Sequence, residues 1–589
     1  MTDNLLYTSH RNPHVADFIR SAKAPAGGYP DEPFSADVRA GKGTSFYRAH
    51  TYHTKVPPQG IEPFIAHYTK PGQVVLDPFC GSGMTGIAAI LQGRRAVLSD
   101  LSPAATFFAF NHCRPLDVDA FLGAGEAIAR SVEREYGWLY TTKRRGEVGD
   151  MPFNKMLWSL TLCCPSCDGE YSLWEAALDE NRRILTEYPC PECGAVITKK
   201  QSRWAGMQPV RVDYRSGAFK EALPDEHDLA LLEKIENLPW PDDLWYPTDP
   251  VPKEGDEIRR LHHDGIGSVD GLFTKRALLC VAALWREAGR AKAALRPSLQ
   301  FAVTGIMQRA SRLNKFIPSL NMSPGPILGT MYIPGFYPEM NVFGLFRRKL
   351  NAIGRSHRKL RGDGGGGGEV CVSTQSATDL SNLPDASVDY VFTDPPFGSN
   401  IQYSELNLMW ESWLGVRTDA KHEAVVSRTQ GKSESDYGGL MAQAFVEMRR
   451  VLKAGGWLTL VFHNSSGKVW SAIQDALAAG GLSVGSIHTF DKAHDTFKMV
   501  TAPGAVGYDV VVNCRKREAA ARPRRGEAAG IGAAREFVRE FIASNTHEDS
   551  PRRLHARAIA HFMTQHRPIS FDYGEFRVMA EEELSSQGK

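Results

Sequence analysis

The segment at residues 73–100 limits the fold of this chain more than any other. QVVLD (73–77) is an apolar strand pattern, PFCGSGMTGIAAILQG is a glycine turn that leads into a helix, and RAVLSD (95–100) is a second strand pattern. A strand, a helix and a strand in this order form a β-α-β unit, which requires parallel strands and a right-handed crossover. Two strands make only part of a sheet, so its other strands must come from elsewhere in the chain.

A second group of patterns, at about 369–515, supplies those strands. VCVSTQSATD, DYVFTDPPF and GWLTLVFHN read as strands, FVEMRRVLKAGG and VWSAIQDALAAGG as helices, and SVGSIHTF with GYDVVVNCRK as a closing pair of strands. Each half lacks part of a sheet, and together they predict one doubly wound α/β sheet. The intervening stretch of about 250 residues is too long for a loop, so we expect an inserted domain.

The expected organisation has five parts, and 589 residues are enough for several domains. A glycine run, GDGGGGGEV at 362–370, marks the end of the insertion as a flexible hinge. We expect an N-terminal extension at 1–43, the two halves of the α/β domain at 44–115 and 369–515, the insertion at 116–368, and a basic linker with a helical tail at 516–589.

The composition is that of a soluble globular protein. Hydrophobic residues make up 42% of the chain and aromatic residues 10%, which is enough for a sizeable core. No run of about 18 apolar residues occurs, so we expect no membrane-spanning helix. The first residues, MTDNLLYTSHRNPH, lack the basic and then apolar layout of a secretion signal, which predicts a cytoplasmic protein.

Four of the ten cysteines form two C-x-x-C pairs, CPSC and CPEC, with 22 residues between the pairs. In a chain without a secretion signal, such pairs favour a metal over disulfides. Four thiolates around a tetrahedral zinc ion leave no open position for chemistry, so the predicted zinc ribbon at about 160–200 is structural. Its expected ligands are Cys164, Cys167, Cys190 and Cys193, and the adjacent Cys163 is a spare or substitute thiol.

The glycine turn after the first strand has the layout of a nucleotide-type site. Gly81 and Gly83 stand where the backbone comes close to a ligand at a helix N-terminus, which favours a carboxylate or a phosphate. Asp100 ends the next strand, 23 residues after Asp77, at a spacing suited to ribose hydroxyls. The lysine of a Walker motif is absent, which disfavours an ATPase. A tight turn without any ligand is the alternative reading.

The stretch Asp394-Pro395-Pro396-Phe397 directly follows a strand pattern. An exocyclic amine of a nucleobase is a poor nucleophile because its lone pair is delocalised into the ring. A carboxylate that accepts one N–H and a carbonyl that accepts the other help to localise that pair, and the prolines hold both acceptors rigidly. Phe397 offers a face on which an extruded base can stack. The plainer reading is a loop aspartate before a stiff Pro-Pro turn.

The motifs DPFCGSGMTG and DPPF together resemble the S-adenosylmethionine-dependent amino-methyltransferases that modify adenine N6 or cytosine N4 in DNA. The likeness covers about 44–115 and 369–515, and implies a doubly wound, Rossmann-like methyltransferase sheet interrupted by the insertion. It implies S-adenosylmethionine as cofactor, a catalytic loop at 394–397, and a cofactor site that includes Lys55, Asp77, Pro78, Phe79, Gly81, Gly83, Asp100 and Asp379.

Two of these assignments have plain alternatives. Asp100 is expected to contact the ribose and Asp379 the adenine of the cofactor, although Asp379 also suits a helix cap or a turn. Lys55 corresponds to a lysine beside the methionine portion, or it is an ordinary surface lysine. Tyr403 and Glu405 lie close enough in sequence to line the base pocket, or belong to a helix core.

The order of cofactor loop, insertion and catalytic loop resembles the subgroup whose target-recognition region lies between the two motifs. DPPF favours adenine N6 over cytosine N4, and differs from the commoner DPPY by the loss of a hydroxyl. The residues also allow an RNA base methyltransferase, or a nucleic-acid-binding protein with an idle cofactor fold. No nuclease motif occurs in the chain, so any restriction or defence partner would be encoded separately.

The basic cluster at 344–361 contains no acid and is expected to contact the phosphates of double-stranded DNA, and the segment 307–341 is expected to shape recognition of the target. Clusters without acids suit phosphate contacts, which position a protein without reading sequence. The segment 307–341 has the alternative of an irregular surface loop, and the zinc ribbon either contacts DNA or serves only as a scaffold. The residues expected to contact nucleic acid are Arg309, Arg312, Arg347, Arg348, Lys349, Arg355, Arg358 and Lys359.

Overall fold

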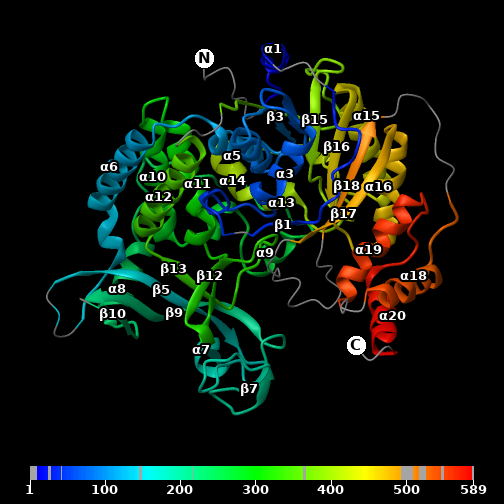
Figure 1. Cartoon of the computed structure of the whole chain (residues 1–589). Coiled ribbons are helices and arrows are strands. Elements are labelled where there is room, and N and C mark those ends of the chain that lie inside the picture. Colours follow the sequence, from blue (N-terminus) through cyan, green and yellow to red (C-terminus); the bar gives the residue numbers. More distant parts are fainter. Residues whose placement is uncertain are drawn as a thin grey trace. The chain divides into compact units, whose positions relative to one another are not determined.

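The computed structural model describes residues 10–586 except 24–27, 42, 145–146, 148, 217, 363–366, 492–508, 517–525 and 546–549 (Figure 1). The centre of the glycine run and most of the basic linker therefore lie outside the described residues.

The chain divides into two compact units. Unit 1 comprises 1–115, 356–407 and 416–589, and unit 2 comprises 116–355 and 408–415. Unit 2 thus begins where the insertion was expected to begin. Its far boundary lies inside helix α12 (Val342–Arg361) rather than in the glycine run. Unit 2 also takes in α14 (Leu408–Leu414), a short helix that follows the catalytic motif.

Unit 1 is built on an eight-stranded sheet in the order β1-β17-β18-β16-β15-β2-β3-β14. Every neighbouring pair is parallel except those of β18, which runs antiparallel to both β16 and β17. The strands are β1 (Val38–Arg39), β2 (Val74–Asp77), β3 (Arg95–Asp100), β14 (Val370–Thr374), β15 (Val388–Thr393), β16 (Leu452–Phe462), β17 (Leu482–Asp491) and β18 (Asp509–Lys516).

Helices cover both faces of this sheet because its central strands are apolar on both sides. All residues of β2 and β15 are buried. Side chains alternate between the faces: Val74 and Leu76 join one core cluster, and Val75 joins the other. The first cluster includes α15 (Glu434–Val451), α16 (Gly467–Ala479) and the tail helices α18 (Ile531–Ser544), α19 (Pro551–Thr564) and α20 (Tyr573–Ser586); the second includes α3 (Pro58–Tyr68), α4 (Met84–Leu91) and α5 (Pro103–Cys113).

The strand order reverses direction between β2 and β15. The chain proceeds from β2 to β3 on one side, and from β15 to β16 on the other, while β2 and β15 themselves pair in parallel, Val75 opposite Tyr390 and Leu76 opposite Val391. Ligands of open α/β sheets bind in the crevice outside the carboxyl ends of the strands at such a switch point. The glycine turn and the DPPF loop both begin at this edge.

Unit 2 contains a mainly antiparallel sheet and several helices. Four strands run in the order β10-β9-β5-β13, and β4 and β6 also pair with β5. These strands are β4 (Thr141–Thr142), β5 (Met151–Cys163), β6 (Glu170–Ser172), β9 (Arg203–Ser216), β10 (Ala218–Ala222) and β13 (Phe336–Met340). In addition to most of α12, the main helices of unit 2 are α6 (Val118–Tyr136), α8 (Glu226–Glu236), α10 (Lys275–Arg290) and α11 (Arg296–Ala310).

The segment 307–341 is more regular than one of the two readings of the sequence allowed. It contains a hairpin of β11 (Asn314–Ile317) and β12 (Met322–Pro326), followed by β13, which joins the main sheet of unit 2. The mixed α/β class predicted from the sequence is confirmed. Within the described ranges, none of the helices is both long enough and apolar enough to cross a membrane.

Unit 2 contains a buried ion pair. The Arg276 and Glu339 side chains are each 1% exposed and form an ion pair, and Trp158 Nε1 donates to Glu339 Oε2 at 2.9 Å. Removing one partner of a buried pair leaves an uncompensated charge.

Glu339→Ala should therefore lower the free energy of unfolding by about 3–5 kcal/mol, measured by urea denaturation. The matched control is Asp150→Ala, which breaks the exposed pair with Lys143 and should cost less than about 1 kcal/mol. Equal losses in the two variants would contradict a special role for the buried pair.

Candidate active site and metal centre

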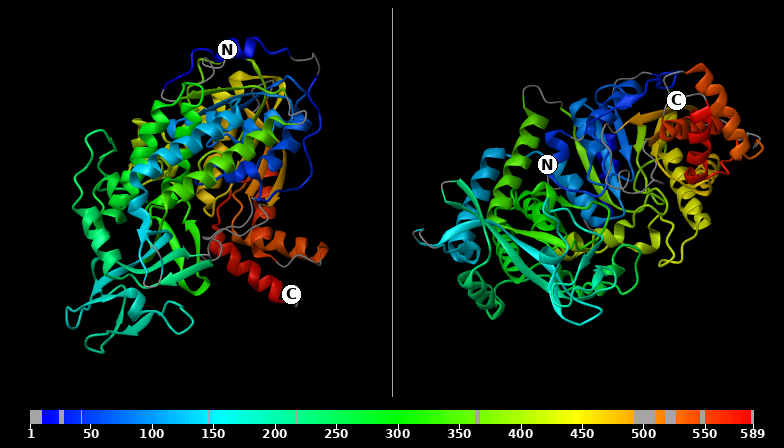
Figure 2. Two further views of the ribbon diagram at one scale, coloured as in Figure 1. Left: turned by 90° about the vertical axis from the view of Figure 1, so that its left-hand side faces the viewer. Right: turned by 90° about the horizontal axis from the view of Figure 1, so that it is seen from below.

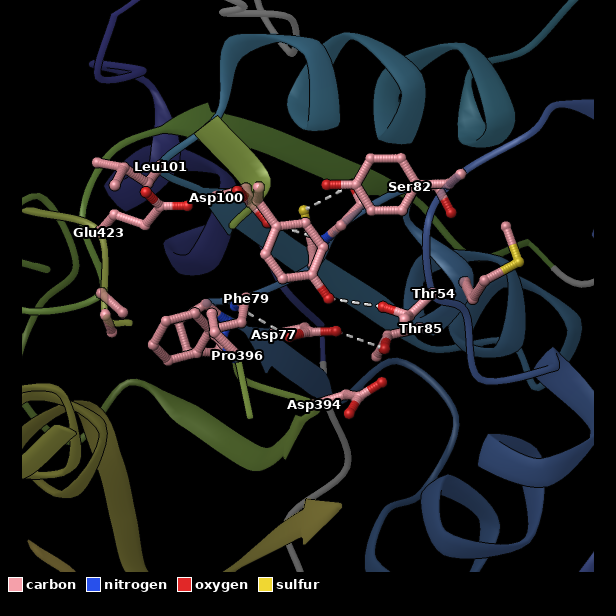
Figure 3. Close-up of a pocket in the computed structure, with 18 of the residues that line it drawn as sticks. Thr54, Asp77, Phe79, Ser82, Thr85, Asp100, Leu101, Asp394, Pro396 and Glu423 are labelled. Carbon is pink, nitrogen blue, oxygen red and sulfur yellow. Dashed lines mark hydrogen bonds between the residues drawn. The ribbon is translucent and has the colours of Figure 1, made fainter. Parts of the chain in front are cut away.

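Segments far apart in the sequence line one cleft at the carboxyl edge of the unit 1 sheet (Figure 3). The space between its walls amounts to about 940 Å³, counting the part that is open to solvent. Of the residues predicted for the cofactor and catalytic sites, those that line it are Lys55, Asp77, Pro78, Phe79, Gly81, Asp100, Asp394 and Pro396. The structure thus brings the glycine turn and the catalytic motif to the same cavity.

The turn after β2 requires glycine at two positions. Gly81 and Gly83 have φ of 48° and 83°, in the left-handed region that side chains disfavour. A Cβ on Gly83 would lie 2.7 Å from Ala109 Cα, and one on Gly81 would lie 3.1 Å from Tyr52 Cε1. Gly83 therefore lets α4 pack against α5, and Gly81 keeps the floor of the cleft open beside Tyr52.

Asp77 fixes the conformation of this turn. Its Oδ1 accepts a hydrogen bond from Phe79 N at 3.1 Å, and its Oδ2 accepts one from Thr85 Oγ1 at 2.6 Å. Burial raises the pKa of Asp77 to about 8, and the nearby Asp394 and Asp100 act in the same direction. Asp77 is therefore largely protonated at neutral pH.

Asp100 connects the end of β3 to the glycine turn. Its Oδ2 accepts from Gly81 N and its Oδ1 accepts from Ser102 N, both at 2.9 Å. A carboxylate oxygen can accept more than one hydrogen bond, so Asp100 can hold the turn and contact the hydroxyls of a ligand at once.

Lys55 lies in the cleft wall, and the alternative of an ordinary surface lysine is wrong. Its side chain is buried, and Nζ donates to the carbonyl oxygens of Tyr47 and of His50, the latter at 2.9 Å. The ammonium group also lies 4.1 Å from the centre of the Tyr47 ring. Its charge thus fixes the segment before α3 beside the cleft.

The structure does not bring Asp379 into the site. Its side chain is 52% exposed and forms an ion pair with Arg11 at 2.6 Å, and this hydrogen-bonded pair lowers the pKa of Asp379 to about 2. Among the described residues that line the cleft, three neighbours on the same loop take its place: Ser376, Ala377 and Thr378. Sequence reasoning misplaced Asp379 because its partner is 368 residues away in the chain.

Hydrogen bonds from neighbouring elements hold the catalytic motif. Tyr437 donates its hydroxyl to the Pro396 carbonyl at 2.8 Å, and Asn464 Nδ2 donates to the Phe397 carbonyl at 2.7 Å. The Phe397 ring is half-buried and packs edge-on against Phe462 at 5.4 Å between ring centres. Asp394 and Pro396 face the cleft, while Pro395 is buried behind them.

Several residues that line the cleft were missed by the sequence analysis. Tyr52 and Thr54 both contact Tyr403: the Tyr52 ring stacks on it at 6.2 Å between ring centres, and Thr54 Oγ1 shares a 2.6 Å hydrogen bond with its hydroxyl. Glu423 is buried and accepts from Ser404 N at 2.9 Å. Glu423 belongs to neither the glycine turn nor the DPPF motif, and only the tertiary structure indicates its place in the cleft.

Comparison with known proteins supports this reading of the cofactor half. The model of an N6/N4 methylase family, described as DNA methylase, matches residues 28–107. The chain is also 35% identical over 97 residues to "Putative methylase YubD" of Escherichia coli (strain K12), a match that covers 16% of this chain and 39% of that protein.

The resemblance to the N6/N4 DNA methylases is confirmed. The methylase-like segment matched by the family, residues 28–107, includes the glycine turn and Asp100, whereas the predicted catalytic motif at 394–397 lies outside this family match. The chain spans about two fifths of the length of the curated relative.

Outside the methylase-like segment, the four predicted metal ligands of unit 2 come together. The sulfur atoms of Cys164, Cys167, Cys190 and Cys193 all lie within 4.8 Å of one another. Cys164 is 3.9 Å from Cys193, and Cys167 is 3.9 Å from Cys190, measured between sulfur atoms. Thiolates at about 2.3 Å from a tetrahedral zinc ion would stand about 3.8 Å apart, so the cluster is compatible with zinc.

The two knuckles that carry these cysteines have the same backbone turn. The residue after the second cysteine of each pair has a left-handed conformation, with φ of 57° at Asp168 and 73° at Gly194. Asp168 N donates to Cys164 O, and Gly194 N donates to Cys190 O, both at 2.9 Å. Strands β7 (Glu187–Pro189) and β8 (Val196–Thr198) frame the second knuckle.

The predicted phosphate-binding residues do not form one group. Arg347 forms ion pairs with Glu126 at 3.0 Å and Glu133 at 2.8 Å on α6, so its charge is already compensated and its assignment to DNA is corrected. Burial and the charge of Arg309 lower the pKa of Lys349 to about 8. Arg312 and Lys349 are half-buried, and the exposed members of the predicted set are Arg309, Arg348, Arg355, Arg358 and Lys359.

The raised pKa of Asp77 predicts a pH-dependent stability. Between about pH 4 and pH 8 the unfolded chain releases the Asp77 proton and the folded chain keeps it, so stability falls as the pH rises through this window. In Asp77→Asn the new amide can donate to the Thr85 hydroxyl, so the hydrogen bond between the two side chains is kept. The variant has no carboxyl group at this position to titrate, so the fall in stability that Asp77 causes between about pH 4 and pH 8 should disappear. Thermal melting at pH 5, 6, 7 and 8 tests it.

Asp379→Asn is the control for that measurement. The pKa of Asp379 is lowered, so its contribution to stability is lost only when the pH falls through about 2 to 4. Its melting curve should keep the wild-type slope between pH 5 and pH 8, and a wild-type slope in Asp77→Asn would contradict the assigned protonation of Asp77.

The thiolate cluster predicts one tightly held zinc ion per chain, detected by elemental analysis of the purified protein. Cys167→Ser should lose the metal and lower the melting temperature, because metal binding contributes to folding of a small β unit. Cys163→Ser, which changes a buried cysteine beside the cluster, should keep the metal. Zinc retained in Cys167→Ser would exclude this ligand set.

Proposed function

We propose that the protein transfers a methyl group from S-adenosylmethionine to an exocyclic amine of DNA, adenine N6 in preference to cytosine N4. The observation that carries the proposal is the cleft shared by Gly81 of the glycine turn and Asp394 of the catalytic motif. The strand order around β2 and β15 supports a Rossmann-like methyltransferase fold, with the site at the switch point.

The residues of the cleft fit an adenosine-containing cation. Gly81 leaves space that a Cβ would fill, Asp100 offers acceptors for ribose hydroxyls, and Thr378 belongs to the loop expected beside the adenine ring. The carboxyl groups of Asp77, Asp100 and Asp394 surround the same space (Figure 3). S-adenosylmethionine, when bound, would supply a sulfonium-linked methyl group for an attacking amine.

The catalytic loop has the rigidity that orientation of an amine requires. Asp394 faces the cleft and would accept one N–H of the target amine. The second acceptor expected from the sequence is the Pro395 carbonyl, but Pro395 is buried and does not line the cleft, whereas Pro396 does. The carbonyl groups of Pro396 and Phe397 are held by Tyr437 and Asn464, so the loop is fixed on both sides of the Pro-Phe bond. Fixing the acceptors before the substrate binds lowers the entropic cost of the reactive geometry.

Double-stranded DNA is the proposed partner of both units. The exposed residues Arg309, Arg348 and Arg355 in unit 2, and Arg358 and Lys359 in unit 1, are suited to phosphate contacts. The zinc ribbon is proposed as a structural element of the inserted target-recognition region. Adenine is preferred because the motif begins with aspartate.

Asp394→Ala should reduce methyl transfer by at least about a hundredfold, because the amine loses its fixed acceptor. The assay uses labelled S-adenosylmethionine with unmethylated genomic DNA, and with RNA in a parallel reaction. Cofactor affinity, measured by calorimetry, should change little. Mass spectrometry of the digested nucleosides distinguishes N6-methyladenine from N4-methylcytosine.

Asp379→Ala is the matched control, since it removes a carboxylate whose ion pair lies outside the cleft lining. It should retain both cofactor binding and transfer. Full turnover by Asp394→Ala would refute the role given to Asp394. Methylation of RNA alone would show that RNA, and not DNA, is the substrate.

A further inference from the structure

The C-terminal tail is built into the core of unit 1. Apolar residues of α18, α19 and α20, such as Val538, Ile559 and Phe576, belong to the same buried cluster as Phe462 of β16 and Trp470 of α16. Figure 2 shows these helices, orange to red, in two further views. The sequence analysis assigned no role to this tail. Because its apolar side chains are buried in the same cluster as those of the sheet, the tail is part of the core of unit 1.

The link between α19 and α20 contacts the start of α16 directly. Asp572 Oδ1 accepts a hydrogen bond from Gly467 N, and Tyr573 N donates to Ser465 O, both at 2.8 Å. A Cβ on Gly467 would lie 2.5 Å from Phe571 O, so the two backbones approach as closely as a glycine permits. The tail therefore fixes the residues immediately before α16.

Asp572 supplies a cap that α16 does not provide for itself. Ser466 occupies the N-cap position of α16. Within the described part of the chain, its side chain makes no capping hydrogen bond to this helix. The first N–H groups of a helix need acceptors, and a carboxylate at this end is further favoured by the helix dipole. In this helix the acceptor comes from 105 residues downstream.

The residues before α16 hold the catalytic motif in turn. Asn464 is 2% exposed, its Oδ1 accepts from Ser466 N, and its Nδ2 donates to the Phe397 carbonyl, both at 2.7 Å. Trp470 Nε1 donates to the Asn464 carbonyl at 3.0 Å. The ring of Phe397 also packs against Phe462 and against His463. Asn464 thus joins the start of α16 to the loop that faces the cleft.

We propose that Asn464 is a positioning residue for the catalytic loop, and that the tail, through Asp572, holds Asn464 in place. The tail then acts on the orientation of Asp394 and Phe397 without touching the substrate. This role rests on the proposed methyl transfer, but the mechanical link from Asp572 to Phe397 does not.

Asn464→Asp tests the link at its buried end. The two side chains have the same shape, so Oδ1 can still accept from Ser466, but an ionised carboxylate cannot donate to the Phe397 carbonyl. Hydrogen exchange of peptides covering 393–400, measured on the protein without cofactor or DNA, should become faster. In the transfer assay kcat should fall by roughly tenfold or more, with cofactor affinity within about twofold of wild type.

A pH profile separates positioning from a general loss of structure. The protonated form of the new carboxyl group can donate to the Phe397 carbonyl, so the ratio of variant to wild-type kcat should rise as the pH is lowered from 8 to 6. A loss of structure would lower activity and cofactor affinity together at every pH.

Asp572 tests the same link from the exposed surface, where substitution opens no cavity. Asp572→Ala should speed exchange at 393–400 and lower kcat, and Asp572→Asn, which keeps an acceptor for Gly467 N, should recover most of both. Glu575→Ala removes another exposed carboxylate in the first turn of α20 and should behave as wild type. Asp572→Ala also keeps the test decisive if Asn464→Asp does not fold.

The proposal is overturned if exchange at 393–400 is unchanged in Asp572→Ala, or if Glu575→Ala speeds it equally. If exchange responds as expected but the wild-type protein transfers no methyl group to DNA or RNA, the link stands and the proposed function fails. If transfer occurs and the exchange does not respond, the function stands and the role of the tail is wrong.

Discussion

The parallel pairing of β2 with β15 is the constraint on which the site depends. Val75 lies opposite Tyr390 and Leu76 opposite Val391, so the carboxyl ends of two strands from distant parts of the sequence meet at one edge. Asp77 and Asp394 follow within three residues of these pairs. A slip of one residue in this register would turn every side chain of the strand to the other face, which both buried cores forbid.

The elements that were predictable are those whose information is local. RAVLSD reads as a strand, and β3 runs from Arg95 to Asp100, because its apolar pattern and flanking turns need no distant partner. The partners of charged residues were not predictable in this way. The segment around Arg347 contains no acid, but Glu126 and Glu133 on α6 compensate its charge, and Arg11 removes Asp379 from the site by the same kind of distant pairing.

The protonation of Asp77 determines the charge of the cleft. Burial is the main cause that raises the pKa of Asp77, and the nearby carboxyl groups of Asp394 and Asp100 raise it further. With Asp77 neutral, the turn keeps both of its hydrogen bonds and Asp394 faces less negative charge. A bound cation would favour the ionised form of Asp77, so binding of such a ligand should be coupled to release of a proton.

The insertion is tied to the catalytic half by more than its two ends. After the catalytic motif the chain passes into unit 2 at Leu408 and leaves it after Gly415. In this short return, Trp410 Nε1 donates to the Thr304 carbonyl at 3.1 Å, and the ring of Trp413 packs against Trp285 of α10. Both tryptophans are fully buried, so the core of unit 2 is complete only with residues that the sequence places next to the catalytic loop. The core of the proposed target-recognition region is therefore complete only with residues 408–415, which follow the catalytic loop in the sequence. For this reason the two structural units do not coincide with the successive segments expected from the sequence.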